Sequence, residues 1–264
     1  MAHDFKTLRI ETTGFVTTVT LCRPALLNRF DGEAHSELLL ALAMLEGFAD
    51  HRVIIFEAEG KVFSAGGDLE EVARMQRDSA HRARMFREAR AVVRGMLALE
   101  VPIIVALHGD AIGLGASLVV LCDIVVASRN AGICDPHVAI GLVAGDGGCL
   151  GWPAAAGIMR AKRYLLTGER IDAEAAFAAG IVTDLVETPQ DAILRARQLA
   201  ERVASLAPLA VRGTKRALNS TMIALYHGGF EVSCSVEEQT AMSEDVAEGA
   251  KAFGERRKPV FRGV

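Results

Sequence analysis

Two glycine-bearing segments carry the clearest chemical signal in this sequence: residues 61–69 (KVFSAGGDL) and residues 105–118 (VALHGDAIGLGASL). Each follows an apolar, β-branched run and leads into a helical pattern, so each should present free backbone N–H groups at the start of a helix. Two such donors aimed at one point form an oxyanion hole, which stabilises an enolate or a tetrahedral oxyanion derived from a thioester or ketone. Because this chemistry needs only glycine-permitted backbone geometry, the surrounding side chains must select the reaction.

The first part of the chain alternates between strand and helix patterns. Residues 7–11 and 15–21 alternate apolar with polar residues around Thr13 and Gly14, which predicts an antiparallel hairpin. Apolar runs typical of buried strands lie at residues 53–58, 103–107 and 124–127. Helical patterns separate them at residues 31–48, 80–99 and 116–122. This alternation predicts an α/β unit with parallel pairing and right-handed crossovers.

After residue 185 the chain changes character, because helical patterns follow one another without a further strand candidate. They lie at residues 191–206, 208–225, 230–242 and 244–253. With too few strands nearby to cover their apolar faces, these helices are expected to pack on another subunit. We therefore predict a core with the ligand site over residues 1–200 and a helical oligomerisation region over residues 201–264.

The composition excludes several classes of function. The chain has 264 residues, is 51% hydrophobic and carries a formal net charge of −4. Nucleic acid is therefore not an expected partner, whereas a small phosphate-bearing ligand needs only a few cations and helix ends. No apolar stretch is long enough to span a bilayer and no secretory signal is found, so we expect a soluble cytoplasmic protein. The 5 widely spaced cysteines fit reduced core thiols, and no cluster has metal-ligand spacing.

With both glycine segments in place, the chain resembles the crotonase superfamily, also called the enoyl-CoA hydratase/isomerase family. Further motifs in the family's order and spacing lie at residues 23–28 (RPALLN), 122–124 (CDI), 141–148 (GLVAGDGG), 166–173 (LTGERIDA), 179–182 (AGIV) and 253–259 (FGERRKP). The resemblance implies a spiral of ββα turns followed by a helical C-terminal region that drives trimerisation. It also implies a homotrimer or a dimer of trimers.

The same resemblance implies an acyl-CoA ligand, so that coenzyme A is part of the substrate and no separate cofactor is expected. The thioester oxygen would meet the backbone N–H groups of Gly67 and Leu114. Residues expected along the adenine and pantetheine path are Leu26, Ala65, Asp68 and Leu69. Lys258 or Arg257, in this subunit or a neighbouring one, would meet a CoA phosphate.

The sequence departs from the family pattern where hydratases typically carry two glutamates. Ser117 and His137 stand at those positions. Because a hydroxyl without a partner cannot act as a general base near neutral pH, the usual paired-carboxylate mechanism is not available. Asp146 follows at the start of another helix, which stabilises its anion and suits it to orient an imidazole. We therefore expect His137 to carry the proton, with Asp146 as its partner.

One branch of the superfamily, the β-diketone hydrolases, looks similar around these residues. It has a Pro-His segment, a Gly-Asp-Gly stretch and a Trp-Pro pair, similar to Pro136-His137, residues 141–147 and Trp152-Pro153 here. That branch lacks the Gly-x-Gly segment that this chain keeps at residues 113–115. Its retention favours a CoA thioester over a free diketone.

Other residues near these motifs are expected to have structural roles. Glu238 lies on a C-terminal helix that in this fold approaches the pocket, but Glu237 beside it favours a solvated helix face. Trp152 either walls the acyl pocket or packs in the core. Histidines expected at the surface are His35, His51 and His81.

Three functions are consistent with these residues. We favour a lyase-type acyl-CoA enzyme that polarises the thioester at Gly67 and Leu114 while His137 and Asp146 move a proton or activate water. The second is hydrolysis of a C–C bond in a β-dicarbonyl compound by the same pair. The third is a non-catalytic acyl-CoA-binding protein that has lost both glutamates.

Overall fold

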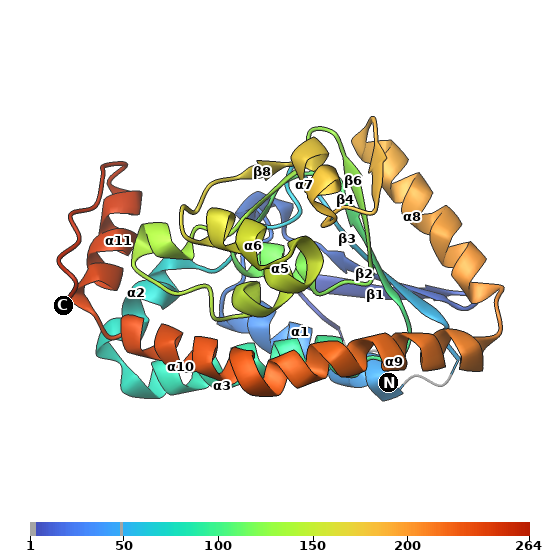
Figure 1. The fold of residues 1–264 in the computed structure, drawn as a ribbon, viewed down its shortest axis with the longest axis horizontal. Coiled ribbons are helices and arrows are strands. Elements are labelled where there is room, and N and C mark those ends of the chain that lie inside the picture. The colour runs from blue at the N-terminus through green and yellow to red at the C-terminus, as the bar shows by residue number, and fades with distance from the viewer. Residues whose placement is uncertain (1–3, 48–49) are drawn as a thin grey trace.

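The computed structural model describes residues 4–47 and 50–264, which fold around a six-stranded sheet (Figure 1). Its strands stand in the order β1-β2-β3-β4-β6-β9. Their bounds are β1 (Leu8–Thr13), β2 (Val16–Leu21), β3 (Val53–Ala58), β4 (Ile103–Leu107), β6 (Ile124–Ser128) and β9 (Asp184–Val186). β1 and β2 form an antiparallel hairpin, and the other neighbouring pairs are parallel. The predicted hairpin and parallel α/β unit are therefore confirmed.

A second sheet consists of three short strands, in the order β5-β7-β8. Their bounds are β5 (Ala111–Ile112), β7 (Gly132–Cys134) and β8 (Ile171–Asp172). Ser64 forms a parallel bridge with Ala111, and β5 is parallel to β7, so three successive passes of the chain run side by side in one direction. Parallel segments end at the same edge. The residues directly after Ser64, β5 and β7 therefore gather at this edge.

The chain repeats one local arrangement three times: a strand of the large sheet, a segment of the small sheet, then a helix. The three turns are β3, Ser64 and α2 (Leu69–Arg77); β4, β5 and α4 (Leu114–Val120); and β6, β7 and α5 (Gly148–Ala156). A short 3-10 helix, η2 (His137–Ile140), lies between β7 and α5. This is the predicted spiral of ββα turns.

Helices cover both faces of the large sheet (Figure 1). On one face, α1 (Gly32–Gly47) and α3 (Ser79–Ala98) bury leucines, valines and a methionine in the main core. On the other, α8 (Pro189–Ala204) lays a row of alanines against β3, β4 and β6. The small alanine side chains allow the helix to approach the sheet closely. The remaining helices of the middle region are α6 (Ile158–Leu165) and α7 (Ala173–Ala179).

The C-terminal helices run back along the molecule to the end opposite α8 (Figure 1). They are α9 (Pro208–Leu225), a π-helical turn (Tyr226–Phe230), α10 (Glu231–Thr240) and α11 (Glu244–Gly254). α10 packs against α3, and α11 packs against α2 and η2. The predicted boundary near residue 200 lies inside α8, a helix that belongs to the sheet. Among the described residues, no helix has the length and apolarity needed to cross a membrane.

Several predictions about burial are wrong. His35, His51 and His81 are buried, and burial lowers the pKa of His35 to about 4. Glu237 is also buried, at 5% exposure, although its helix face was expected to be solvated. The cysteines are free thiols, but Cys149 is exposed rather than part of the core. Phe48, the predicted end of the first helix, lies outside the described residues.

Candidate active site

The two glycine segments meet through direct backbone contact. Gly66 has φ +85°, and a Cβ built on it would lie 2.7 Å from the carbonyl oxygen of Ile112 and 3.5 Å from Cα of Gly113. Ser64 ties the segments together, because its carbonyl accepts the N–H of Ile112 at 2.9 Å. A Cβ built on Gly115 would lie 2.7 Å from Cβ of Ser64. Glycine is therefore required on both sides of the contact.

Several backbone donors beside the contact have no acceptor within the described part of the chain, among them those of Gly67 and Leu114. Leu114 is the first residue of α4, where an N–H has no partner within the helix. The donor that precedes each of these amides is occupied: Gly66 donates to Ser64 Oγ at 3.1 Å, and Gly113 donates to the carbonyl of Cys134 at 2.8 Å. The two amides that the sequence predicted are thus among the backbone donors without a protein acceptor beside the contact, and their role as an oxyanion hole stays a prediction.

The imidazole of His137 lies beside this contact. A Cβ built on Gly113 would lie 3.8 Å from Cε1 of His137 and 3.7 Å from Cα of Gly66. His137 is the first residue of η2, which comes soon after β7. One edge of the small sheet therefore brings together both glycine segments and the histidine, although they are far apart in the sequence.

Two carboxylates flank the ring, one at each nitrogen. Nδ1 of His137 lies 2.5 Å from Oδ1 of Asp135, and Nε2 lies 3.5 Å from Oδ2 of Asp146. Asp146 is therefore next to the imidazole, but the shorter contact, and the one that orients the ring, belongs to Asp135. Ser117 donates its hydroxyl to Oδ1 of Asp146 at 2.9 Å. The serine at the family's glutamate position thus holds the carboxylate that faces Nε2.

This cluster retains protons more tightly than exposed groups would. Burial by itself disfavours the imidazolium, but attraction to the carboxylates of Asp135 and Asp146 outweighs it and holds the pKa of His137 well above 6.5. Burial also raises the pKa of Asp146, although His137 and the Ser117 hydroxyl oppose that rise. The two carboxylates therefore favour the protonated form of the His137 imidazole over the neutral ring.

Asp135 and Glu237 are members of the site that the sequence did not indicate. Asp135 has 2% exposure and follows β7 immediately. Glu237 reaches the site from α10: a Cβ built on Gly145, the neighbour of Asp146, would lie 2.5 Å from its Oε2. Both side chains keep one carboxylate oxygen without a hydrogen-bond partner in the described part of the chain. The position of Asp135, two residues before His137, was the one available signal.

The cluster also has the composition of a metal site, which sequence spacing did not reveal. The ligating atoms of Asp135, His137 and Asp146 lie within 4.8 Å of one another. The 2.5 Å contact between Nδ1 and Asp135 is a hydrogen bond, too short to admit an ion between the atoms. Nε2 and the Asp146 carboxylate remain as ligands. This geometry suits proton transfer better than a closed metal shell.

The residues predicted along the coenzyme path lie on two adjoining segments. Residues 27–30 run beside residues 65–68, with Ala65 donating to Leu27, Phe30 to Gly66 and Asp68 to Phe30 at 2.8–2.9 Å. Leu26, at 41% exposure, and Leu69 lie at the ends of these segments. The Asp68 carboxylate is occupied, because it caps α2 and contacts Arg29 Nε at 3.0 Å. Lys258 is exposed beyond α11, the helix that packs against α2.

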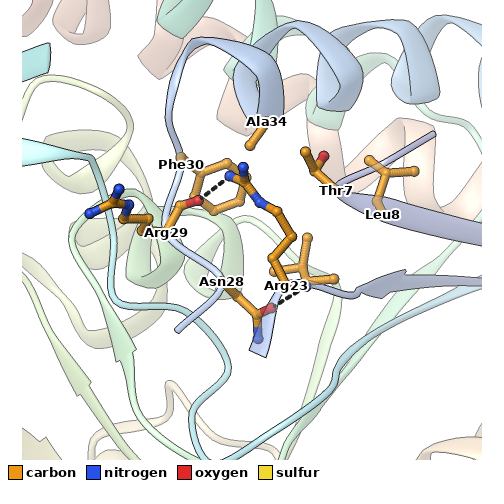
Figure 2. A pocket seen from close by; sticks show the side chains of 8 residues that line it. Thr7, Leu8, Arg23, Asn28, Arg29, Phe30 and Ala34 are labelled. Atoms are coloured by element: carbon orange, nitrogen blue, oxygen red, sulfur yellow. Dashed lines mark hydrogen bonds between the residues drawn. The ribbon is translucent and has the colours of Figure 1, made fainter. Parts of the chain in front are cut away.

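Arg23 forms hydrogen bonds with Asn28 and Arg29, two residues of the first of these segments (Figure 2). Its guanidinium donates to the Arg29 carbonyl at 2.8 Å and pairs with Asp31, while its backbone N–H donates to Asn28 Oδ1 at 2.9 Å. The pocket beside Arg23 has a volume of about 10 Å³. That volume has room for about one water molecule, so this pocket is too small to hold a substrate.

Trp152 belongs to the core. It is fully buried and packs against Tyr164 with ring centroids 5.8 Å apart. Of the two roles considered for it, the structure therefore supports packing.

Comparison with known proteins gives one consistent picture. The family model described as Enoyl-CoA hydratase/isomerase matches residues 11–264. An (E)-benzylidenesuccinyl-CoA hydratase from Thauera aromatica is 36% identical over 256 residues, which cover 97% of this chain and 98% of the relative. An enoyl-CoA hydratase/isomerase structure from Mycobacterium paratuberculosis has a TM-score of 0.90 at 34% identity, covering 94% and 99%. A β-diketone hydrolase structure from the cyanobacterium Anabaena sp. PCC 7120 has a TM-score of 0.82 at 26% identity, covering 90% and 95%.

Replacing Gly115 with alanine should loosen the contact between the glycine segments. The new Cβ would lie 2.7 Å from Cβ of Ser64, so α4 must move away. We expect Gly115→Ala to lower the free energy of unfolding by about 1–3 kcal/mol in urea denaturation. Gly213→Ala is the matched control, because nothing lies within 4 Å of that position and alanine favours a helix. Equal stability of Gly115→Ala and wild type would show that the segments are not locked here.

Proposed function

The chain belongs to the enoyl-CoA hydratase/isomerase family of acyl-CoA enzymes, and from that premise we propose that its reaction takes place between the two glycine segments and His137. The thioester oxygen accepts hydrogen bonds from the N–H groups of Gly67 and Leu114. Charge that develops on this oxygen as an enolate forms is then stabilised by preorganised donors. The observation that carries the proposal is the pair of amides without a protein acceptor, together with the position of the imidazole, whose Cε1 would lie 3.8 Å from a Cβ built on Gly113.

His137 and the two aspartates supply the proton chemistry. With Nδ1 bonded to Asp135, the other ring nitrogen, Nε2, is the atom that exchanges a proton with the reacting water. Asp146 lies across from Nε2 and holds that water or the imidazolium that forms. In hydration, water adds to the β-carbon of an enoyl thioester while Nε2 takes its proton. The similarity to a benzylidenesuccinyl-CoA hydratase supports an α,β-unsaturated thioester substrate.

Coenzyme A binds along the paired segments 27–30 and 65–68. We place the adenine and pantetheine against Leu26, Ala65 and Leu69, with the backbone rather than the carboxylate of Asp68 facing the ligand, since that carboxylate already caps α2. Lys258 meets a phosphate from the exposed segment after α11.

The C-terminal helices assemble the protein into a homotrimer or a dimer of trimers. Large apolar side chains stand exposed on or near these helices in the single chain. Among them are Leu209, Leu218, Val232, Phe253 and Val260, each more than half exposed. Burial of these exposed apolar side chains against another subunit is what supports the proposed assembly. Light scattering coupled to size exclusion determines the number of subunits.

Hydrolysis of a C–C bond in a β-dicarbonyl compound is the second candidate. It is favoured by the likeness to a β-diketone hydrolase together with the close placement of His137 and Asp146. In that reaction water attacks the second carbonyl, the C–C bond breaks, and the electron pair passes to the carbon next to the polarised carbonyl. The same amides and the same imidazole serve both reactions.

A panel of enoyl-CoA and β-ketoacyl-CoA thioesters in heavy water, analysed by mass spectrometry, tests the proposal. Hydration yields one product heavier by the elements of water, whereas cleavage yields two fragments. We expect turnover of an enoyl thioester by the wild type. Thioester binding without turnover or deuterium uptake at the α-carbon would instead indicate a non-catalytic binding protein.

His137→Ala should lower kcat by about a hundredfold or more, because general base catalysis typically contributes that much. Thioester binding, measured by calorimetry, should remain close to that of the wild type, since the amides and the coenzyme path are unchanged. An unaltered kcat in this variant would remove His137 from the mechanism.

Asp135→Asn should move the pH dependence of kcat/KM. His137 acts as a base only when neutral, and its raised pKa places the acidic limb of the profile above pH 6.5, with activity rising as pH rises through it. Removing the Asp135 anion lowers the pKa of His137, so the acidic limb of the kcat/KM profile should shift to lower pH. The maximal kcat/KM at high pH should also fall. Asp172→Asn, at an exposed helix cap, should leave the limb in place. A limb that stays fixed or moves upward in Asp135→Asn would contradict this assignment.

A further inference from the structure

We propose that Glu237 is a second proton-transfer residue of the site, and that it delivers a proton to the carbon next to the thioester while His137 handles the proton of water. The inference rests on the proposed function and adds the acid that the sequence lacks at Ser117. The proton that reaches the α-carbon would then come from a residue on α10, a helix that lies outside the spiral of ββα turns.

The position of Glu237 follows from close packing of α10 on Gly145. A Cβ built on Gly145 would lie 2.5 Å from Oε2 and 2.7 Å from Cβ of Glu237, and 2.7 Å from the carbonyl oxygen of Ser233. Cys234 lies against the same residue, with Sγ 3.3 Å from the Gly145 carbonyl oxygen. A side chain at residue 145 would displace α10, so glycine there lets Glu237 reach the backbone beside Asp146.

The carboxylates near Glu237 favour its neutral, proton-bearing form. The carboxylates of Asp135, Asp146 and Glu237 are all buried, and the charges of Asp135, Asp146 and His137 act on Glu237. Arg90, on α3, is a cation whose charge acts on Glu237. Its guanidinium contacts the carboxylates of Glu231 at 3.1 Å and Glu238 at 3.9 Å instead. The ionisable groups that act on Glu237 or respond to it are Asp135, His137, Asp146, Cys149, Cys234 and Arg90.

Burial and the nearby carboxylates act on Glu237 in the same direction. Burial, followed by repulsion from the Asp146 anion, raises the pKa of Glu237 well above its usual range. His137 and Arg90 oppose the rise without reversing it. A carboxylic acid that remains protonated near neutral pH can serve as a general acid.

The contacts of Glu237 do not explain its presence as a stabilising residue. Its Oε2 is buried without a hydrogen-bond partner among the described residues. Burying a polar group without a partner destabilises the folded state, and a glutamine or an apolar side chain could fill the same volume. Its neighbour Glu238 stays partly exposed, with a side-chain exposure of 38%, and contacts Arg90. The inward residue of the pair is therefore placed for chemistry.

The proposed step balances in protons and electrons. Water adds its oxygen to the β-carbon, and its proton passes to Nε2 of His137 as the C–O bond forms. The electron pair of the double bond moves onto the thioester as an enolate held by Gly67 and Leu114. The enolate then takes the Glu237 proton at the α-carbon. His137 ends protonated and Glu237 ionised, and proton exchange with solvent resets both groups. In C–C cleavage, Glu237 protonates the carbon released by the broken bond.

Two measurements in heavy water separate the roles. The first is hydration of whichever enoyl thioester the wild type turns over. The second is exchange of the α-hydrogen in the corresponding saturated acyl-CoA, which reverses the Glu237 step and needs no water addition. Glu237→Gln should slow both by about a hundredfold or more. His137→Ala should slow hydration alone. Glu238→Gln, the matched control one residue away, should change neither, and thermal melting verifies that each variant is folded.

The outcomes distinguish this inference from the proposed function. Normal exchange and hydration in folded Glu237→Gln would overturn the role of Glu237 while leaving the site of His137 intact. Loss of exchange in His137→Ala but not in Glu237→Gln would also overturn it, since the imidazole would then serve the carbon. A wild-type enzyme inert toward every thioester would overturn the proposed function and this inference with it. A Glu237→Gln variant that fails to fold is replaced by Glu237→Asp, whose shorter acid should lower exchange and keep its pH dependence.

Discussion

The backbone contact between the two glycine segments is the constraint on which the site depends. Gly66 and Gly113 approach so closely that neither tolerates a side chain without displacement or strain, and Ser64 fixes their register through Ile112. This packing leaves Gly67 and Leu114 with donors turned away from any protein acceptor among the described residues. A donor pair set by covalent backbone geometry needs no reorganisation when charge develops on a bound oxygen. The acid–base groups can therefore vary while the donor pair is kept.

The acid–base groups proposed for this chain come from three elements rather than from the two positions of the usual glutamates. Asp135 and His137 follow β7, Asp146 precedes α5, and Glu237 projects from α10. Because the groups are buried together, the charge of each depends on the others, and the cluster favours a state that holds extra protons. Its electrostatic state is thus a property of the cluster rather than of any single residue.

Local sequence signals predicted the scaffold but not the burial of polar groups. The hairpin, the long strands and the C-terminal helices follow from periodicity, and the glycine segments follow from their residue types. β5 and β7 have 2 and 3 residues, too few to show a period. The burial of Glu237 instead of Glu238 depends on how α10 rotates against Gly145, a contact across about ninety residues of chain. His35, His51 and His81 became buried for the same reason, since tertiary packing decides which helix face is covered.

Hydration and C–C cleavage make the same three demands on a site: a polarised carbonyl, a base for water and an acid for carbon. In the proposed mechanism, Gly67 with Leu114, His137 and Glu237 would meet these demands in turn, so the residues alone do not favour one reaction over the other. The difference must lie in what stands opposite Nε2 of His137, either the β-carbon of a double bond or a second carbonyl. Retention of the Gly113–Gly115 segment and of the paired segments 27–30 and 65–68 favours a thioester ligand. The shape of the acyl chain that the site admits would then decide the chemistry.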